Sequence, residues 1–189
     1  VMEHGSATVA YEVYKALLDR AATLMPFACR VVFLADRGFA DTQLMRHLTQ
    51  MGWHFRIRIK ANFWIDHRGQ RRFQVRDISL APSHARFWHR VRVTGQHFGP
   101  VHLAVARPVG SNDYWYVISD EPTEVKTLQE YGLRFDIEEN FLDDKSNGFQ
   151  LESSLLRSAK ALERLCLVLA MTTLYLVSQG TAVVQRGKR

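Results

Sequence analysis

The chain has 189 residues, of which 47% are hydrophobic, so it is long enough to bury one good core with room for a smaller appended unit. Its formal net charge of +6 favours a polyanionic partner, although an excess of this size is also ordinary solubility charge. The eight histidines and two cysteines lack the close spacing of metal ligands, which argues against a zinc site.

The sequence carries no signal for secretion or membrane insertion. Residues 1–15 lack the basic and then apolar segments of a leader. The longest apolar run, Leu165–Val177, is too short to span a bilayer and contains two threonines, so we expect a buried helix there. Cys29 and Cys166 lie in apolar runs, which favours core thiols in a reduced, cytoplasmic protein.

The first elements are predicted to be a helix, a strand and a second helix. Apolar residues repeat with helical spacing over residues 8–25, and Pro26 closes that segment. The β-branched run Arg30–Ala35 is typical of a strand buried on both faces, and Asp36 follows at its carboxyl end. Asp41 then caps a helix that reaches about Met51. From local sequence alone, Asp36 is as readily a turn residue as a functional one.

Residues 53–120 alternate with a period of two and predict a β-rich segment. In its first strand we expect Phe55, Ile57 and Ile59 on one face, and Arg56, Arg58 and Lys60 on the other. Between residues 51 and 110 eleven basic residues meet only two acidic ones. A basic strand face is often only solvated, but clustering on this scale favours contact with phosphates.

The pattern over residues 131–145 predicts a helix with four polar side chains on one face. At about 100° per residue, Tyr131, Arg134, Glu138 and Lys145 fall within one narrow arc. Such a set suits a hard metal ion beside a phosphate, whereas an exposed helix with an ordinary Arg–Glu pair is the plainer interpretation. After a break at residues 146–148, a long helix begins at Ser153 or Ser154 and ends near Gly180. Its inward residues are expected to be Leu155, Leu162, Leu165 and Leu169.

The spacing Tyr-x2-Arg-x3-Glu-x6-Lys over Tyr131–Lys145 resembles the signature of DDE transposases of the insertion-sequence-4 family. A second segment, VVFLADRGF, resembles another landmark of the same family, an apolar strand that ends in an aspartate, here Asp36. The two landmarks occur in the family's order, and the resemblance extends from about Tyr11 to Val177.

The resemblance implies an α/β fold: a partial ribonuclease-H-like core with a β-rich insertion and C-terminal helices. It divides the chain into a core portion (1–60), the insertion (61–118) and a part that completes the core (119–189). It also implies catalysis by Asp36 and Glu138, which would hold Mg²⁺ or Mn²⁺, with two ions in an intact site.

The DNA contacts expected from the resemblance and the basic strand face are Tyr131, Arg134, Lys145, Trp115, Lys60 and Arg58. Trp115 corresponds to a family tryptophan that stacks on a flipped base, although an inward-facing strand aromatic is an equal alternative. Trp53, Trp64 and Trp88 are expected to be packing residues.

The family's first aspartate has no counterpart here, because Glu3 follows no strand and Asp19 lies within a helix. The chain is therefore expected to be the C-terminal part of a transposase that cleaves and joins DNA at transposon ends, and to be inactive by itself. The alternatives are a ribonuclease-H-like nuclease and a non-catalytic DNA-binding remnant. The implied partners are transposon ends, target DNA and a second copy in a homodimer, in the nucleoid of a prokaryotic cytoplasm and not at a membrane.

Overall fold

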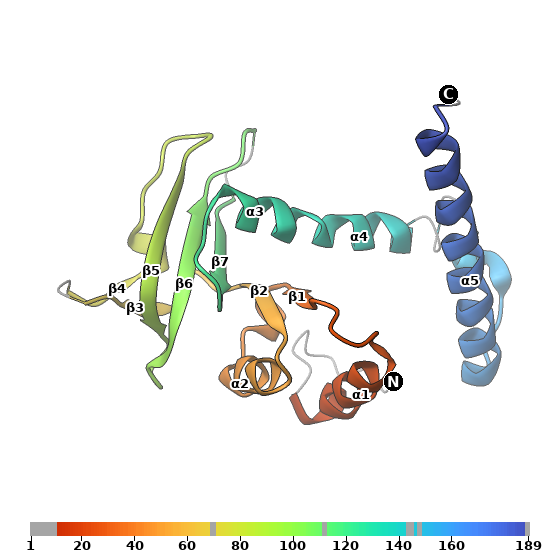
Figure 1. Cartoon of the computed structure of the whole chain (residues 1–189), viewed down its shortest axis with the longest axis horizontal. Coiled ribbons are helices and arrows are strands. Elements are labelled where there is room, and N and C mark those ends of the chain that lie inside the picture. Colours follow the sequence, from red (N-terminus) through yellow and green to blue (C-terminus); the bar gives the residue numbers. More distant parts are fainter. Residues whose placement is uncertain (1–10, 69–70, 111–112, 143–145, 147–148, 188–189) are drawn as a thin grey trace. The chain divides into compact units, whose positions relative to one another are not determined.

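The computed structural model describes residues 11–68, 71–110, 113–142, 146 and 149–187. The chain forms two compact units, residues 1–134 and residues 135–189, which are treated separately below. The first unit is built on a mixed seven-stranded sheet covered by helices (Figure 1). The predicted α/β class is confirmed, and the mixed sheet is compatible with a ribonuclease-H-like transposase fold. The division into three parts at residues 60 and 118 stays a prediction.

The sheet has the strand order β1-β2-β7-β6-β5-β3-β4. Its strands are β1 (Val32–Ala35), β2 (His54–Arg58), β3 (Trp64–Asp66), β4 (Phe73–Gln74), β5 (Ala85–Val93), β6 (Phe98–Ala106) and β7 (Trp115–Ser119). Only β1 and β2 pair in parallel, and the remaining pairs are antiparallel. The β-rich segment predicted from alternation therefore forms one continuous sheet with β1.

The main core lies on the face of the sheet that α1 (Tyr11–Leu24) and α2 (Thr42–Gln50) cover. From α2, Leu44, Met45 and Leu48 are fully buried, because their helical spacing turns one stripe towards the strands. They meet the alternating residues of β2 and its extension, including Phe55 and Ile57. As predicted, Asp41 caps α2, and Gly52 follows the helix with a positive φ of 71°.

The opposite face of β2, β7 and β6 carries polar side chains and is covered by α3 (Val125–Gly132) (Figure 1). Arg56 pairs with Ser119, and Ser119 pairs with His102 on the next strand. Since directly paired residues point to the same face, these three side chains form a row across the sheet. Arg56 in this row belongs to the charged groups described below.

Two expectations about burial in this unit are wrong. β1 lies at an edge of the sheet, so Val32, Phe33 and Leu34 are only half-buried and the strand is not covered on both faces. Cys29 is exposed, as is Cys166 in the second unit, so neither thiol fills a core.

The predicted helix over residues 131–145 is interrupted at Leu133. Tyr131 and Gly132 end α3, and α4 (Arg134–Leu142) begins after a one-residue turn. Gly132 weakens the helix at this point because glycine has the largest backbone entropy to lose. The expected apolar stripe is exposed, with 57% of Leu133 and 48% of Ile137 accessible, whereas Tyr131 is fully buried.

The second unit contains α4, a short 3₁₀ helix η4 (Leu151–Ser154) and α5 (Ala159–Gln185). The long C-terminal helix thus begins later than expected and continues past Gly180. Leu162 and Leu165 are half-buried and Leu169 is buried, as predicted, but Leu155 precedes the helix and is exposed. The prediction of a buried helix over Leu165–Val177 is therefore wrong for most of its length, since Leu167, Met171 and Leu174 are among its exposed apolar residues. This small unit offers too few partners to surround a helix of 27 residues.

By length and composition alone α5 could cross a membrane, with a mean hydropathy of 1.6 in its most apolar window. One such helix is weak evidence, because apolar core helices meet the same test. The shorter apolar run recognised in the sequence is extended on its C-terminal side to residue 185.

Candidate functional site

Asp36 stands at the carboxyl end of β1, where the strand passes into the short 3₁₀ helix η1 (Arg37–Phe39). Its backbone is extended, and its Oδ1 atom accepts a hydrogen bond of 2.8 Å from the amide of Gly38. This bond fixes the direction of the carboxylate, while the residue itself is exposed. Asp36 is therefore both a turn-capping residue and an oriented, accessible oxygen ligand at a strand end.

Arg58 and Lys60 lie at the same end of the sheet. The register pairs Ala35 with Ile57, so the chain position next to Asp36 across the ladder is Arg58. The Arg58 guanidinium donates to Asp113 Oδ2 at 3.2 Å and to the Tyr114 carbonyl at 2.9 Å. Lys60 is exposed at the end of the β2 extension. The backbone register thus places two residues predicted to contact DNA at the same end of the strand pair as Asp36.

A surface cavity of about 450 Å³ opens next to this strand end. Lys60, Arg37 and Tyr14 line it, together with residues 94–96 from the turn between β5 and β6. Burial, followed by the negative charge of Asp41, raises the pKa of the Tyr14 hydroxyl to about 12. This hydroxyl consequently stays neutral at physiological pH and offers a hydrogen bond rather than a charge.

Trp115, Tyr131 and Arg134 form a connected group in the first unit. Trp115 begins β7, and the Ile59 amide donates to the neighbouring Tyr116 carbonyl at 2.8 Å, which places Trp115 at the carboxyl end of β2. Its ring meets Tyr131 edge-on with centroids 5.5 Å apart. Arg134 Nε donates to the Tyr131 hydroxyl at 3.2 Å. Tyr131 is fully buried, so it holds Arg134 in place instead of presenting its own hydroxyl at the surface.

The other two members of the predicted stripe, Glu138 and Lys145, lie outside the first unit. Glu138 is exposed on α4 in the second unit. Lys145 lies outside the described residues. The contact between Arg134 and Tyr131 is the part of the stripe described within the first unit, and the pairing of Asp36 with Glu138 stays a prediction.

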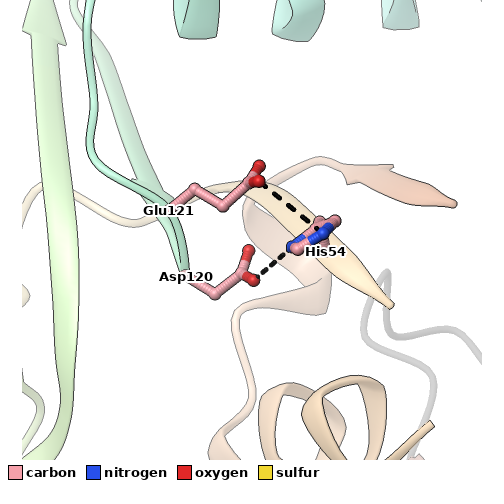
Figure 2. A group of neighbouring side chains, drawn as sticks. All are labelled: His54, Asp120 and Glu121. Atoms are coloured by element: carbon pink, nitrogen blue, oxygen red, sulfur yellow. Dashed lines mark hydrogen bonds and ion pairs between the residues drawn. The ribbon is translucent and has the colours of Figure 1, made fainter. Parts of the chain in front are cut away.

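A second cluster occupies the opposite end of the parallel strand pair. His54 begins β2, and Asp120 and Glu121 follow β7 (Figure 2). His54 Nδ1 lies 2.7 Å from Asp120 Oδ2, and His54 Nε2 lies 3.6 Å from Glu121 Oε1. Because Val32 pairs with His54 and Asp36 is four residues further on, this cluster is about 13 Å along the strands from Asp36.

Two arginines form ion pairs with the carboxylates around this cluster. Arg56 Nη2 lies 2.6 Å from Glu121 Oε2 and 2.9 Å from Glu130 Oε2, and only 4% of its side chain is exposed. Arg30 also reaches Glu121 at 2.6 Å. Burial alone would raise the pKa of Glu121, but the hydrogen bond and charge of Arg56, with His54 and Arg30, hold that pKa below its usual value.

One ligand atom each from His54, Asp120 and Glu121 lies within 4.8 Å of the others, a spacing that a metal ion could use. However, the two ring nitrogens of His54 face different carboxylates, so one ion cannot take both, and a cation would compete with Arg30 and Arg56 for Glu121. We therefore interpret this group as an ion-pair network that ties β2, the β7–α3 connection and α3 together. In the part of the chain that the structure describes, no cluster of three potential ligands includes Asp36.

The expected basic strand face is only partly correct. Phe55, Ile57 and Ile59 are buried on one side, as predicted. Arg56 on the other side is 3% exposed and bound by carboxylates, so it cannot reach a phosphate. Of the four tryptophans, Trp53 and Trp88 are packing residues as expected, but Trp64 is 42% exposed with Arg72 over its ring, which corrects its assignment.

Comparison with known protein families identifies the chain. The family model described as the transposase DDE domain matches residues 10–175. The chain belongs to this family. Membership supports a transposase function with DNA as the substrate, and DDE transposases typically use divalent metal ions. A search of curated proteins found no match.

The ion-pair network of this DDE domain was not predicted from the sequence. Asp120 and Glu121 directly follow the apolar strand β7, the same pattern that singled out Asp36. Their partner His54, however, is 66 residues away from Asp120 in sequence, so no local spacing joined them.

Proposed function

We propose that this chain is part of the catalytic domain of an insertion-sequence-4-type transposase that cleaves and joins phosphodiesters at transposon ends. Asp36 and Glu138 are the catalytic carboxylates in this proposal. The observation that carries it is the strand end itself: an exposed, oriented Asp36 with Arg58 and Lys60 at the same edge. That arrangement suits a negatively charged backbone brought up to a metal-binding carboxylate.

Asp36 fits a hard divalent cation by its chemistry. It supplies an anionic oxygen, it is accessible, and the Gly38 amide already orients it. With Glu138 it would hold Mg²⁺ or Mn²⁺, and two ions at an intact site would activate the attacking oxygen and stabilise the leaving oxygen. In this proposal Asp36 and Glu138 hold the ion, and the residues named next align the DNA.

The remaining predicted residues act on DNA in this proposal. Arg58, Lys60 and Arg134 contact phosphates, and Lys145, outside the described residues, joins them. Tyr131 acts through Arg134, since its buried hydroxyl accepts from that guanidinium. Trp115 is half-buried and edge-on to Tyr131, and in this proposal its indole ring stacks on a displaced base. A homodimer that brings transposon ends to target DNA completes the proposal.

A second candidate is a DNA-binding protein without catalysis. It is favoured by the capping bond of Asp36, which gives this residue a structural role, and by the lack of a three-ligand cluster at Asp36 among the described residues. A nuclease that uses the same carboxylates for hydrolysis alone is the remaining alternative.

Iron-directed backbone cleavage distinguishes the two metal-dependent candidates from the non-catalytic one without requiring turnover. Fe²⁺ takes the place of Mg²⁺ in carboxylate sites and, with ascorbate and peroxide, cuts the protein near the bound ion. For the full chain we expect cuts close to Asp36 and Glu138, suppressed by excess Mg²⁺ and lost in Asp36→Asn. The matched control is Asp41→Asn, because asparagine still caps α2 there.

Two results would contradict the proposal. Cuts confined to the neighbourhood of His54, Asp120 and Glu121 would place the metal in the ion-pair network. Cuts that are equally strong in Asp36→Asn and in Asp41→Asn would leave Asp36 with its capping role only.

A further inference from the structure

A basic cavity of about 540 Å³ lies on the outer side of β3 and β5, remote from Asp36. Its lining includes Asp66, His67, Arg68, His89, Arg90 and Arg92, and we call it the bulge cavity. In the strand order, β5 stands three positions from β2, or roughly 14 Å at the usual strand spacing. Its residues belong to neither the strand-end group nor the ion-pair network.

The charge of the bulge cavity is largely uncompensated. Arg90 and Arg92 are exposed, as is Arg68, and none of the three makes an ion pair within the described residues. The one acid in the lining, Asp66, already faces His97 Nδ1 at 3.3 Å. Three guanidinium groups against one carboxylate give the cavity a net charge of +2 with its histidines neutral.

The histidines add to this need for an anion. The Nδ1 atoms of His89 and His102 are 3.1 Å apart, so one ring must donate to the other. Burial, then His89 and Arg90, lower the pKa of His102. His67 Nδ1 is buried and has no hydrogen-bond partner in the described part of the chain. In the tautomer that carries hydrogen on Nδ1, His67 would donate to an anion placed in the cavity.

The backbone beneath the cavity is held in an unusual conformation. The register of β5 and β6 shifts between Trp88 and Val91, and Arg90, at this bulge, has a φ of +56°. A side chain in the left-handed region costs free energy that glycine or asparagine would largely avoid. Opposite, Gly99 packs so closely that a Cβ atom would stand 2.6 Å from the Val91 carbonyl oxygen. Bulges of this kind re-aim a side chain, here that of an arginine.

We propose that the bulge cavity binds the phosphate backbone of duplex DNA, as a metal-independent contact separate from the strand-end site. This inference rests on the proposed function, because it takes the DNA substrate from it. Arginines suit phosphate through paired donors, and the cavity has no aromatic lining residue besides its histidines on which bases could stack. The contact is therefore independent of DNA sequence and adds to affinity and positioning.

The test measures binding of a labelled 30-base-pair duplex of mixed sequence to the full chain by fluorescence anisotropy, with chelator and over a range of salt. The cavity variant is Arg90→Asn with Arg92→Gln, since asparagine tolerates the positive φ of position 90. The charge-matched control is Arg20→Gln with Arg76→Gln, two exposed arginines outside the cavity. Tryptophan fluorescence in urea confirms that each variant is folded.

The loss of two phosphate contacts should reduce the slope of log K against log salt by about 2 and weaken binding at 0.1 M salt by roughly 10- to 100-fold. The control should change the slope by less than half as much. Equal slopes for the two double variants would overturn the proposal, because only net charge would then matter. Because the assay contains chelator, its result does not depend on a metal ion at Asp36, so a failure of the catalytic proposal leaves it intact.

Discussion

The substitution of Arg56 by methionine tests whether the ion-pair network holds the first unit together. Methionine keeps most of the length of the side chain and removes the charge. The guanidinium donates to Glu130 Oε2 at 2.9 Å, to Glu121 Oε2 at 2.6 Å and to Ser119 Oγ at 3.0 Å. All three acceptors would lose this donor at once, although Glu121 keeps its bond from Arg30. The Arg56 side chain is only 4% exposed, so water cannot simply take its place.

Removal of one partner of a buried ion pair lowers the free energy of unfolding by about 3–5 kcal/mol. Glu121 and Glu130 remain 31% and 19% exposed, so water can reach them and the lower end of that range applies. We expect a loss of about 3 kcal/mol, which at a urea m value of about 2 kcal/mol/M lowers the midpoint by about 1.5 M. Arg58→Met, two positions along the same face and paired with a 73% exposed Asp113, should cost less than about 1 kcal/mol.

The assay is urea unfolding followed by tryptophan fluorescence. All four tryptophans, Trp53, Trp64, Trp88 and Trp115, lie in the first unit, so the signal reports on that unit alone. A further exchange, Glu130→Gln in the Arg56→Met background, should recover part of the loss, because it removes one orphaned carboxylate. Equal midpoints for Arg56→Met and Arg58→Met, or strict additivity of Arg56→Met and Glu130→Gln, would refute the reasoning.

Three further predictions follow from other parts of the structure. Gly99→Ala should destabilise the first unit by about 2 kcal/mol or more, since its Cβ would clash with the Val91 carbonyl at 2.6 Å in a positive-φ backbone; an unchanged urea midpoint would contradict this. Because the pKa of Glu121 is lowered in the folded chain, its stabilisation is present above the usual 4.5 and is lost as the pH falls through the folded value; Glu121→Gln should flatten the pH dependence of the urea midpoint below 4.5. The 189-residue chain should bind labelled duplex without nicking or joining it in Mg²⁺ or Mn²⁺, and cleavage that disappears in Asp36→Ala would show a complete site instead.

Local sequence predicted those elements whose pattern depends on near neighbours. The alternation of Phe55, Ile57 and Ile59 located a strand and its buried face, because side chains in a strand point to opposite sides in turn. Asp41 and Gly52 marked the ends of α2 by their own backbone chemistry. Asp36 was found for the same reason, since the end of an apolar strand is visible in the sequence.

Burial that depends on distant partners was not predictable in this way. Arg56 looked like a phosphate contact because its carboxylate partners, Glu121 and Glu130, are 65 and 74 residues away. From its spacing, Tyr131 was expected on the same helix face as polar residues. Its ring instead packs against Trp115 of β7 and is fully buried. The break at Leu133 then placed Glu138 on a separate helix, so the angles of a single helix no longer applied.

The strand order also has a consequence for how the first unit folds. The strands β5 and β6 pair across a short turn, with Val93 opposite Phe98, and this hairpin can form early. The pair of β2 and β7 instead joins Ile57 to Ile118, 61 positions apart (118 minus 57), and closes a loop that contains four other strands. Chain entropy opposes such a closure until many contacts form together. We therefore expect the β2–β7 ladder to be the late step of folding, with amides of β5 and β6 protected from hydrogen exchange before those of β2.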